Sequence, residues 1–445
     1  MLVGMASSVH PVRRLLTHVF RMAARTYFRS IEVVGDVPDA NVGSRLFASN
    51  HVNALVDPIL VVTTAACPIS PVAKSTLWKI PGLAWLLDMA DAVPIVRRRD
   101  APNKSAADND EVFERVAGHL QNGGNILIFP EGTSHNEPHL VALRSGAGRM
   151  LARAKAGGAG DLEVQAVGLE FDERNVFRSR VLVVYGPVVR VADMGDLEGD
   201  ALAERITELL DAGLRELVVE GQTWEERVLV TRVAELLGAE LEDASLEAWN
   251  AIGRRVKAAR ALLRDDDALV SEASAAVTAY YAALGEARTS DAAVRDGGTG
   301  YRPARLPSLL FLLAVLPLAL FGAVVYTLPY QVPRLVVRAA KEEDSDMTST
   351  YKLGAGLVLF PLWALVGCVL AALTLPPAAA LACVVALLTS PFAALAWQDR
   401  LPRLADTFWL LLGRGTRLAH LRHLRARALD AIGRARARAE ALEGA

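Results

Sequence analysis

The chain has few cysteines, few aromatic residues and almost no net charge, and each shortage excludes a class of protein. Three cysteines, Cys67, Cys368 and Cys383, are scattered over 445 residues without the spacing of metal ligands. A disulfide framework and a zinc site are therefore not expected. Lys and Arg number 48 against 50 Asp and Glu, a formal net charge of −2, so a generally basic nucleic-acid-binding protein is excluded. Aromatic residues make up only 6% of a chain that is 52% apolar, which favours a membrane-associated protein.

Apolar residues make up 52% of the chain, and two long stretches near the C-terminus carry no charge. Residues 306–333 form the first stretch, and residues 353–397, interrupted by Pro376 and Pro377, form the second. A membrane-spanning helix needs roughly 20 apolar residues, so the pattern predicts one crossing followed by a hairpin of two. Pro317 leaves open whether the first stretch is re-entrant or only bent. The alternative is that these stretches are buried helices of a large soluble protein.

An amphipathic helix is predicted near the N-terminus, within residues 1–30. Apolar side chains recur there at helical spacing on one face, and arginines occupy the rest of the surface. Such a helix can lie on an anionic bilayer, and the alternative is a helix that packs on the domain with its basic face in solvent. The apolar face comprises Leu15, Leu16, Val19, Phe20, Ala23 and Tyr27.

Short β-branched and apolar runs alternate with stretches of helical length in the first half of the chain. This alternation predicts an α/β domain with a mainly parallel or mixed sheet flanked by helices. In such sheets, functional side chains gather where strands end. The predicted strands are Ile31–Val34, Arg45–Ser49, Pro71–Ala73, Ala92–Val96, Asn125–Phe129, Val164–Phe171 and Val181–Tyr185.

The segment Ser49–Pro58 places a histidine at a strand end and a carboxylate six residues later. The neutral imidazole of His51 is suited to accept a proton near neutral pH. The carboxylate of Asp57, bonded to the other ring nitrogen, would fix the tautomer and stabilise the imidazolium. Alone this pair is weak evidence, because a histidine at a strand end is more often a cap or a satisfied core group.

Two basic residues follow other predicted strands. Lys74 comes directly after Pro71–Ala73, and Arg97 is the first of three arginines at the end of Ala92–Val96. A guanidinium matches phosphate with two parallel hydrogen bonds and stays charged at any relevant pH. Arg97 is therefore a candidate for binding a phosphate-bearing substrate, and Lys74 for lying near the same site. The alternatives are a solvated loop and a surface lysine.

A strand, a proline and a polar turn follow one another at Ile126–His135. The turn presents backbone N–H groups and hydroxyls, which can hold an anion or a polyol, and it can open a helix near Arg144. The alternative is a simple strand-to-helix turn in which the glutamate is the N-terminal cap. The four residues of the turn are Glu131, Gly132, Thr133 and Ser134.

The order of these motifs resembles the glycerolipid acyltransferase superfamily, whose bacterial type is the 1-acylglycerol-3-phosphate acyltransferase. The resemblance covers residues of about 30 to 190. His51 and Asp57 are one residue further apart than is usual in the superfamily. This spacing is similar to that of the fungal glycerol-3-phosphate and dihydroxyacetone-phosphate acyltransferases and their bacterial relatives, and Phe129–His135 and Phe177–Arg180 resemble the same branch. The implied fold is a glycerolipid-acyltransferase-like mixed sheet flanked by helices, followed by a helical region and transmembrane helices.

The resemblance implies a role for each motif residue. His51 would be the general base and Asp57 its orienting partner. Arg97 would hold the phosphate of the acceptor, and Asn53 stands where many members carry a serine or glutamine near the base. The acceptor pocket would be completed by Glu131, Gly132 and Thr133, with Ser134 and Lys74 close by.

Two departures from the family pattern affect the acceptor site. Ser134 and His135 stand where an arginine often follows the Glu-Gly-Thr turn. Phosphate binding would then rest on Arg97, on the backbone of the turn, or on Arg144. The apolar block Val164–Leu169 corresponds to the fourth motif of the family, and the proline that is usual there is missing, with Gln165–Val167 in its place.

The resemblance implies a membrane-bound enzyme that transfers a fatty acyl group from acyl-CoA or acyl carrier protein to the hydroxyl of glycerol-3-phosphate. No metal and no other cofactor are implied, since the hydroxyl attacks the thioester directly. One alternative acceptor is 1-acylglycerol-3-phosphate (lysophosphatidate), whose product is phosphatidic acid. A second alternative is a non-catalytic lipid-binding scaffold on an acyltransferase fold. The expected partners are the lipid bilayer and these substrates, with no nucleic acid.

The expected location is the bacterial inner membrane, with the catalytic domain facing the cytoplasm, where acyl thioesters are made. The arginine-rich C-terminal tail also favours the cytoplasm, whereas three crossings would place that tail on the opposite side. The expected regions are an amphipathic surface helix in 1–30, an acyltransferase domain in 31–195, a helical region in 196–300, a transmembrane region in 301–400 and a basic amphipathic tail in 401–445.

Overall fold

The computed structural model divides the chain into two compact units. The first unit contains Met1–Gln222 together with the short segment Asp344–Thr350, and the second contains Thr223–Glu343 and Tyr351–Ala445. The residues that the structure describes are 11–79, 82–96, 107–264, 266–295, 306–340, 347–412 and 415–443.

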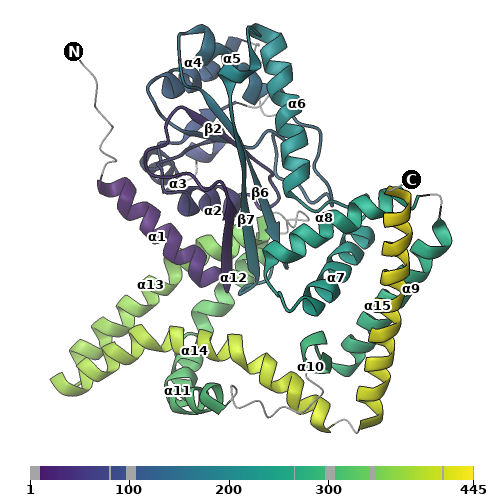
Figure 1. Cartoon of the computed structure of the whole chain (residues 1–445). Helices are drawn as coiled ribbons and strands as arrows, with labels where there is room; N and C mark the ends of the chain where they lie inside the picture. The colour runs from purple at the N-terminus through teal and green to yellow at the C-terminus, as the bar shows by residue number, and fades with distance from the viewer. Residues whose placement is uncertain are drawn as a thin grey trace. The chain divides into compact units, whose positions relative to one another are not determined.

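The first unit is built on a seven-stranded mixed sheet in the order β1-β7-β6-β2-β5-β3-β4 (Figure 1). Strands β2 to β6 run parallel to one another, whereas β7 is antiparallel to β6 and parallel to β1. The mixed sheet and all seven predicted strands are confirmed. The strands are β1 Ser30–Gly35, β2 Arg45–Ser49, β3 Ser70–Lys74, β4 Val93–Ile95, β5 Ile126–Ile128, β6 Glu163–Phe171 and β7 Arg180–Arg190.

The central strands β2 and β5 of this sheet are covered on both faces. All five residues of β2 and all three residues of β5 are buried, as is typical of parallel strands inside an α/β domain. The carboxyl ends of parallel strands meet at one edge of the sheet. The loops that begin at Asn50 and Phe129 therefore start side by side, because β2 pairs with β5.

Helices α4, α5 and α6 pack one against the next in the first unit, and α6 also contacts β6 (Figure 1). α6 belongs to this unit because Leu202, Ile206, Leu210 and Leu214 recur every four residues and are all buried. The unit thus reaches Gln222, beyond the expected boundary at residue 195. Its helices are α1 Pro11–Tyr27, α2 Val56–Thr64, α3 Leu83–Met89, α4 Ala107–Gln121, α5 Gly146–Ala156 and α6 Gly199–Leu217, with 3₁₀ turns at Ser75–Lys79 and Val191–Met194.

The predicted N-terminal helix is present as α1, and it has features of both interpretations. It packs on α2. Its Arg13 also donates to the carbonyl of Ile69, just before β3, at 2.9 Å. Its outer face exposes Leu15, Val19 and Met22, which are 64%, 41% and 62% accessible. A helix that only packed on the domain would leave a polar face in solvent, so these apolar side chains favour the membrane-surface interpretation, which stays a prediction.

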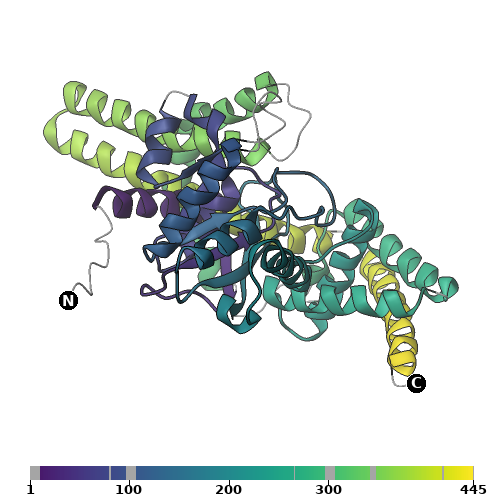
Figure 2. The ribbon, with the colours of Figure 1, turned by 90° about the horizontal axis from the view of Figure 1, so that it is seen from above.

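The second unit is helical throughout the part that the structure describes. α15 lies along α9 (Figures 1 and 2) and buries Leu421, Ala428 and Ile432, so most of the basic tail is a packed helix. The helices are α7 Trp224–Glu240, α8 Leu246–Leu262, α9 Asp267–Ala287, α10 Asp291–Arg295, α11 Leu306–Val325, α12 Thr327–Ala340, α13 Thr348–Thr374, α14 Pro377–Leu412 and α15 Gly415–Glu443.

The predicted apolar hairpin is confirmed by two helices that are long and apolar enough to cross a membrane, Thr348–Thr374 and Pro377–Leu401. Only 6% and 22% of their most apolar segments are buried within the protein. Exposed apolar surface of this length is stable in hydrocarbon and costly in water. α11 and α12 pass the same test only as a bent pair, with an angle of 46°.

The bend between α11 and α12 lies at Tyr326, and not at the proline that the sequence singled out. Pro317 is accommodated within α11. Pro329 lacks the N–H that would bond the carbonyl of Val325, and the indole of Trp363 donates to that carbonyl instead, at 3.1 Å.

Candidate functional site

The loop after β2 brings the carboxylate of Asp57 back to the ring of His51. Nδ1 of His51 lies 3.0 Å from Oδ2 of Asp57. The loop turns through Ala54, whose φ of 24° is in the left-handed region, and Asp57 then lies in the first turn of α2. The two residues, which are six positions apart, therefore form a hydrogen-bonded pair, as the sequence predicted.

Asp57 is held by several donors that converge on one oxygen. Besides the ring of His51, its Oδ2 accepts the backbone N–H groups of Val52 at 2.8 Å and Asn53 at 2.7 Å. The side chain is fully buried. An oxygen that accepts two backbone N–H groups also accepts the ring N–H, so the proton of the neutral His51 ring is on Nδ1.

The other ring nitrogen of His51 is the one available to accept a proton. The ring stacks on Phe129, with centroids 4.0 Å apart and an angle of 19° between the planes. Its side chain is 11% accessible. Because Nδ1 faces a carboxylate, the lone pair of the neutral ring is on Nε2, and no described residue hydrogen-bonds to that atom. This geometry suits removal of a proton from a hydroxyl group.

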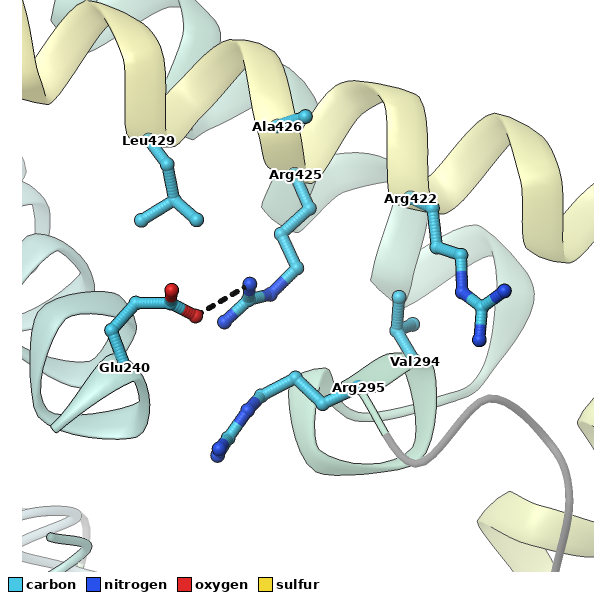
Figure 3. Close-up of a pocket in the computed structure, with 7 residues that line it drawn as sticks. All are labelled: Glu240, Val294, Arg295, Arg422, Arg425, Ala426 and Leu429. Atoms are coloured by element: carbon cyan, nitrogen blue, oxygen red, sulfur yellow. Dashed lines mark ion pairs between the residues drawn. The ribbon is translucent and has the colours of Figure 1, made fainter. Parts of the chain in front are cut away.

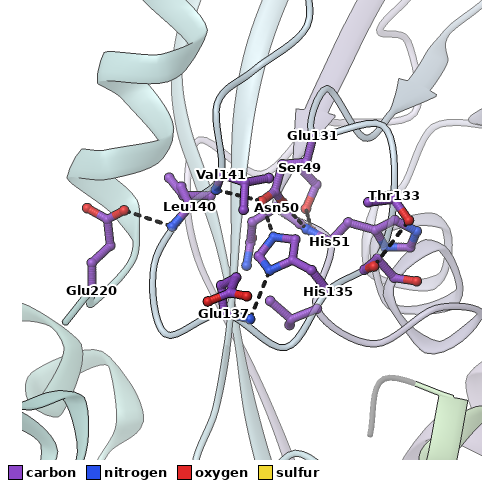
Figure 4. Close-up of polar contacts among 12 residues, drawn as sticks. Ser49, Asn50, His51, Glu131, Thr133, His135, Glu137, Leu140, Val141 and Glu220 are labelled. Carbon is purple, nitrogen blue, oxygen red and sulfur yellow. Dashed lines mark hydrogen bonds and ion pairs between the residues drawn. The ribbon is translucent and has the colours of Figure 1, made fainter. Parts of the chain in front are cut away.

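Glu131 lies inside this site and not on its surface (Figure 4). Its Oε1 accepts the backbone N–H of His51 at 2.6 Å, and its Oε2 accepts from the backbone of Val141 at 3.2 Å and from Nε2 of His135. The side chain is fully buried. These three bonds assign Glu131 to organising the loops. Its predicted contact with a substrate stays a prediction.

His135 is a second histidine in the site that sequence reasoning did not assign to a role. Its Nδ1 accepts the backbone N–H of Glu137 at 3.1 Å, and its Nε2 faces Glu131 (Figure 4). These two partners fix the tautomer with the proton on Nε2. Its own N–H donates to the carbonyl of His51 at 3.2 Å. The spacing of four residues from Glu131 was the signal available in the sequence.

Gly132 has a left-handed backbone conformation that favours glycine, and the side chain of Arg144 lies against it. Gly132 has a φ of 78°, and a Cβ at this position would lie 2.6 Å from Nε of Arg144. The N–H of Arg144 donates to the carbonyl of Pro130 at 2.8 Å. Arg144 is exposed and forms no ion pair with a described carboxylate. The guanidinium therefore lies beside the turn with its charge uncompensated by those residues.

The helix expected after the turn begins near Arg144, but a loop separates it from the glutamate. α5 begins at Gly146 and its N-cap residue is Ser145. The alternative in which Glu131 caps this helix is therefore wrong, because the intervening residues bring the chain back along the site before the helix starts.

Arg174, in the loop after β6, joins two of these loops and was not singled out by the sequence. Its Nη1 donates to the carbonyl of Val52 at 2.7 Å and to that of His135 at 3.2 Å. The carbonyl of Arg174 in turn accepts from the amide of Asn53 at 3.4 Å. Asn53 is fully buried, so it supports the loop; its predicted substrate contact stays a prediction.

Two buried side-chain amides, that of Asn50 after β2 and that of Gln165 in β6, hold neighbouring parts of the sheet together. Asn50 exchanges two hydrogen bonds with the backbone of Leu169, at 2.7 and 3.0 Å, and so ties the end of β2 to β6. Gln165, which replaces the usual proline region, bonds the carbonyls of Asp36 and Gly186 at 2.8 Å each. It lies at an irregularity in the β6–β7 pairing, which explains how β6 keeps its place without the proline.

The remaining predicted residues lie at the same sheet edge or outside the described structure. Lys74 ends β3, which is the neighbour of β5. Thr133 donates through Oγ1 to the carbonyl of Ser134 at 3.2 Å. Arg97 lies outside the described residues, so its predicted phosphate contact stays a prediction.

A separate pocket of about 370 Å³ lies in the second unit, between α7, α10 and α15 (Figure 3). Arg425 is committed to structural ion pairs there, with Glu240 at 2.8 Å and Asp291 at 2.7 Å. The pocket lining contains no histidine or nucleophile, so it lacks the acid–base chemistry of the first unit. Its residues are Glu240, Val294, Arg295, Arg422, Arg425, Ala426 and Leu429.

Comparison with known proteins places the site within a recognised family domain. Residues 30–169 match the family model described as Acyltransferase. Glycerol-3-phosphate O-acyltransferase 2 of Saccharomyces cerevisiae is 37% identical over 105 residues, which are 23% of this chain and 14% of that protein. The matched domain contains His51, Asp57 and the Glu131–Ser134 turn.

Two bacterial proteins match a longer segment. The lyso-ornithine lipid O-acyltransferase of Pseudomonas aeruginosa is 30% identical over 167 residues, which are 37% of this chain and 57% of that protein. The 1-acyl-sn-glycerol-3-phosphate acyltransferase of Borreliella burgdorferi is 27% identical over 165 residues, which are 36% of this chain and 62% of that protein. The chain thus spans less than two thirds of the length of each.

Proposed function

Because residues 30–169 are an acyltransferase domain, we propose that this chain is a membrane-bound acyltransferase that moves a fatty acyl group from a thioester to the hydroxyl of glycerol-3-phosphate. The observation that carries the proposal is the hydrogen-bonded pair of His51 and Asp57. Nδ1 is bonded to the carboxylate at 3.0 Å, and Nε2 is available to accept a proton. The thioester is acyl-CoA or an acyl group carried on acyl carrier protein.

In this mechanism Nε2 of His51 removes the proton of the acceptor hydroxyl as its oxygen attacks the thioester carbonyl. The carbon–sulfur bond then breaks, and the thiolate leaves with the proton returned by the imidazolium. Asp57 stabilises that imidazolium. General-base catalysis of this kind contributes roughly 10²–10⁴-fold, and placing the two substrates together contributes the remainder. The products are the acylated glycerol phosphate and the free thiol.

The geometry supports Arg144 as the partner of the acceptor phosphate. Its guanidinium lies 2.6 Å from the Cβ position of Gly132, in the turn that the family pattern assigns to the acceptor. It lies beside the turn after which the arginine usual in the family is missing. A guanidinium without a carboxylate partner binds phosphate strongly. Arg97 and Lys74 remain further candidates.

The second candidate acceptor is lysophosphatidate. One of the relatives is named 1-acyl-sn-glycerol-3-phosphate acyltransferase, and this acceptor carries the same phosphate and one free hydroxyl. The two acceptors therefore make the same demands on His51 and Arg144. They differ in the acyl chain that lysophosphatidate already carries.

We place the acyltransferase domain on the cytoplasmic side of a bacterial inner membrane. The two apolar helices of the second unit are long enough to span it, and acyl thioesters are made in the cytoplasm. Protease protection in inverted and right-side-out membrane vesicles tests this orientation, because cleavage of the first unit in right-side-out vesicles contradicts it.

The activity is tested with purified protein in detergent, supplied with palmitoyl-CoA and either glycerol-3-phosphate or 1-acylglycerol-3-phosphate. His51→Ala is compared with His18→Ala, which removes an exposed histidine of α1. Transfer to one acceptor that is lost only in His51→Ala supports the proposal and identifies the acceptor. Transfer that persists in His51→Ala removes the base assignment. Folded, membrane-bound protein without transfer from palmitoyl-CoA or palmitoyl acyl carrier protein supports the scaffold alternative.

A further inference from the structure

The first turn of α13 belongs to the first unit, although the rest of that helix is assigned to the second. Ser349 is fully buried, and its Oγ donates to the carbonyl of Arg174 at 2.9 Å. Oγ1 of Thr350 accepts the backbone N–H of Leu55 at 3.0 Å. Two consecutive hydroxyls thus attach the beginning of an apolar helix to the loops of the site.

Both attachment points are one step from the reacting pair. Leu55 lies between His51 and Asp57 and precedes the first turn of α2. Arg174 bonds the carbonyl of Val52 at 2.7 Å. Thr350 therefore holds the loop between His51 and Asp57 directly, and Ser349 holds it through Arg174.

The apolar span begins almost immediately after this attachment. Lys352 is the last charged residue before the apolar stretch, and residues 353–397 carry no charge. At a rise of about 1.5 Å per residue, the three positions from Thr350 to Leu353 cover roughly 5 Å of helix. The attached first turn and the start of the apolar stretch thus belong to one continuous helix, Thr348–Thr374.

We propose that the first turn of α13 is a positioning element that couples the His51 loop to the bilayer surface, so that the enzyme selects acyl donors whose chain is held in the membrane. This inference rests on the proposed function. The thioester of a long-chain donor lies at the head-group level while its chain is in hydrocarbon. A base kept at that level meets the thioester in a reactive position, and displacement of about 1 Å costs up to 10²-fold in rate.

The test uses the full chain reconstituted in phospholipid vesicles and measures kcat/KM for butyryl-CoA, octanoyl-CoA and palmitoyl-CoA. The variant is Ser349→Ala combined with Thr350→Val, which removes both hydrogen bonds and keeps the helix. The expected result is a loss of about tenfold with palmitoyl-CoA and less than twofold with butyryl-CoA, so that the preference for long chains becomes flatter. Thr350→Ser, which keeps the accepting oxygen, is expected to retain the wild-type preference.

Thr348→Val is the matched control, because Thr348 lies in the same turn and its hydroxyl bonds no described residue. An equal loss for all three donors would show that the two hydroxyls only support the loop and would overturn the coupling. An unchanged chain-length profile in the double variant, or a wild-type enzyme indifferent to chain length, would also overturn it. A wild-type protein that transfers none of the three acyl groups contradicts the proposed function instead.

Discussion

The carboxylate of Glu131 accepts the backbone N–H of His51 at 2.6 Å. The residue that family resemblance assigns to the acceptor pocket is thus one of the supports of the catalytic loop. It also accepts from His135 and from the backbone of Val141. One buried anion orders three segments, which are the end of β2, the turn after β5 and the loop that follows.

Glu131→Gln is expected to lower kcat and stability together. A glutamine amide has only one accepting oxygen. Its NH₂ group would take the place of the other carboxylate oxygen and would leave an N–H group that Glu131 accepts in the wild-type protein without a partner. An unsatisfied buried donor costs about 1–3 kcal/mol, and the shift of His51 is expected to reduce kcat by roughly 10². Urea unfolding and steady-state kinetics measure the two effects. Full activity in a destabilised variant would limit Glu131 to a structural role remote from His51.

Asp57→Asn is expected to reduce kcat by roughly 10²–10⁴-fold with a smaller change in KM. The asparagine oxygen can still accept the N–H groups of Val52 and Asn53, so the loop is expected to keep its shape. All three donors bond the same oxygen of Asp57, so the amide oxygen can also accept Nδ1 of His51, but it lacks the negative charge that stabilises the imidazolium when the base takes up a proton. Asp88→Asn is the control, because Asp88 bonds the indole of Trp78 outside the site. Equal losses in the two variants would contradict the assignment.

Gly132→Ala is expected to raise the KM for glycerol-3-phosphate by roughly tenfold, because the added Cβ displaces Arg144 from the turn. Gly123→Ala controls for backbone strain, since Gly123 has the same φ of 78° and nothing within 4 Å of its Cβ position. Arg144→Ala is expected to raise the same KM without loss of stability. An unchanged KM in Arg144→Ala would remove this arginine from the acceptor site.

His119 is expected to make stability depend on pH below neutrality. Burial lowers its pKa below the ordinary value of 6.5, and the nearby Asp91 opposes that shift. The unfolded chain therefore binds a proton more readily than the folded chain, and the free energy of unfolding falls as pH drops below about 6.5. His119→Gln is expected to flatten this dependence in urea unfolding measured between about pH 5.5 and 7.5. An unchanged slope would show that other groups cause it.

Local sequence patterns were enough to predict the strands, the apolar helices and the pairing of His51 with Asp57. Seven apolar runs became seven strands, because burial in a parallel sheet demands such runs. His51 and Asp57 are six positions apart, so a single loop decides whether they meet. Charge-free stretches predicted the apolar hairpin, since the length of a span is a property of the sequence alone.

The supports of the site were beyond local reasoning. The bond from His51 to Glu131 joins residues 80 positions apart, and Leu55 and Thr350 are 295 positions apart. Periodicity tells which face of an element is buried, but it does not tell which loops meet at a sheet edge.

The sequence by itself therefore determined the strands, the apolar helices and the pairing of His51 with Asp57, because these depend on residue type and short spacing. The tertiary structure decided that Glu131 is an internal support, that Arg144 lies on Gly132, and that α13 begins at the catalytic loop. Each of these contacts depends on the order of strands in the sheet and on the paths of the loops between them, and it is packing of the whole unit that selects those paths.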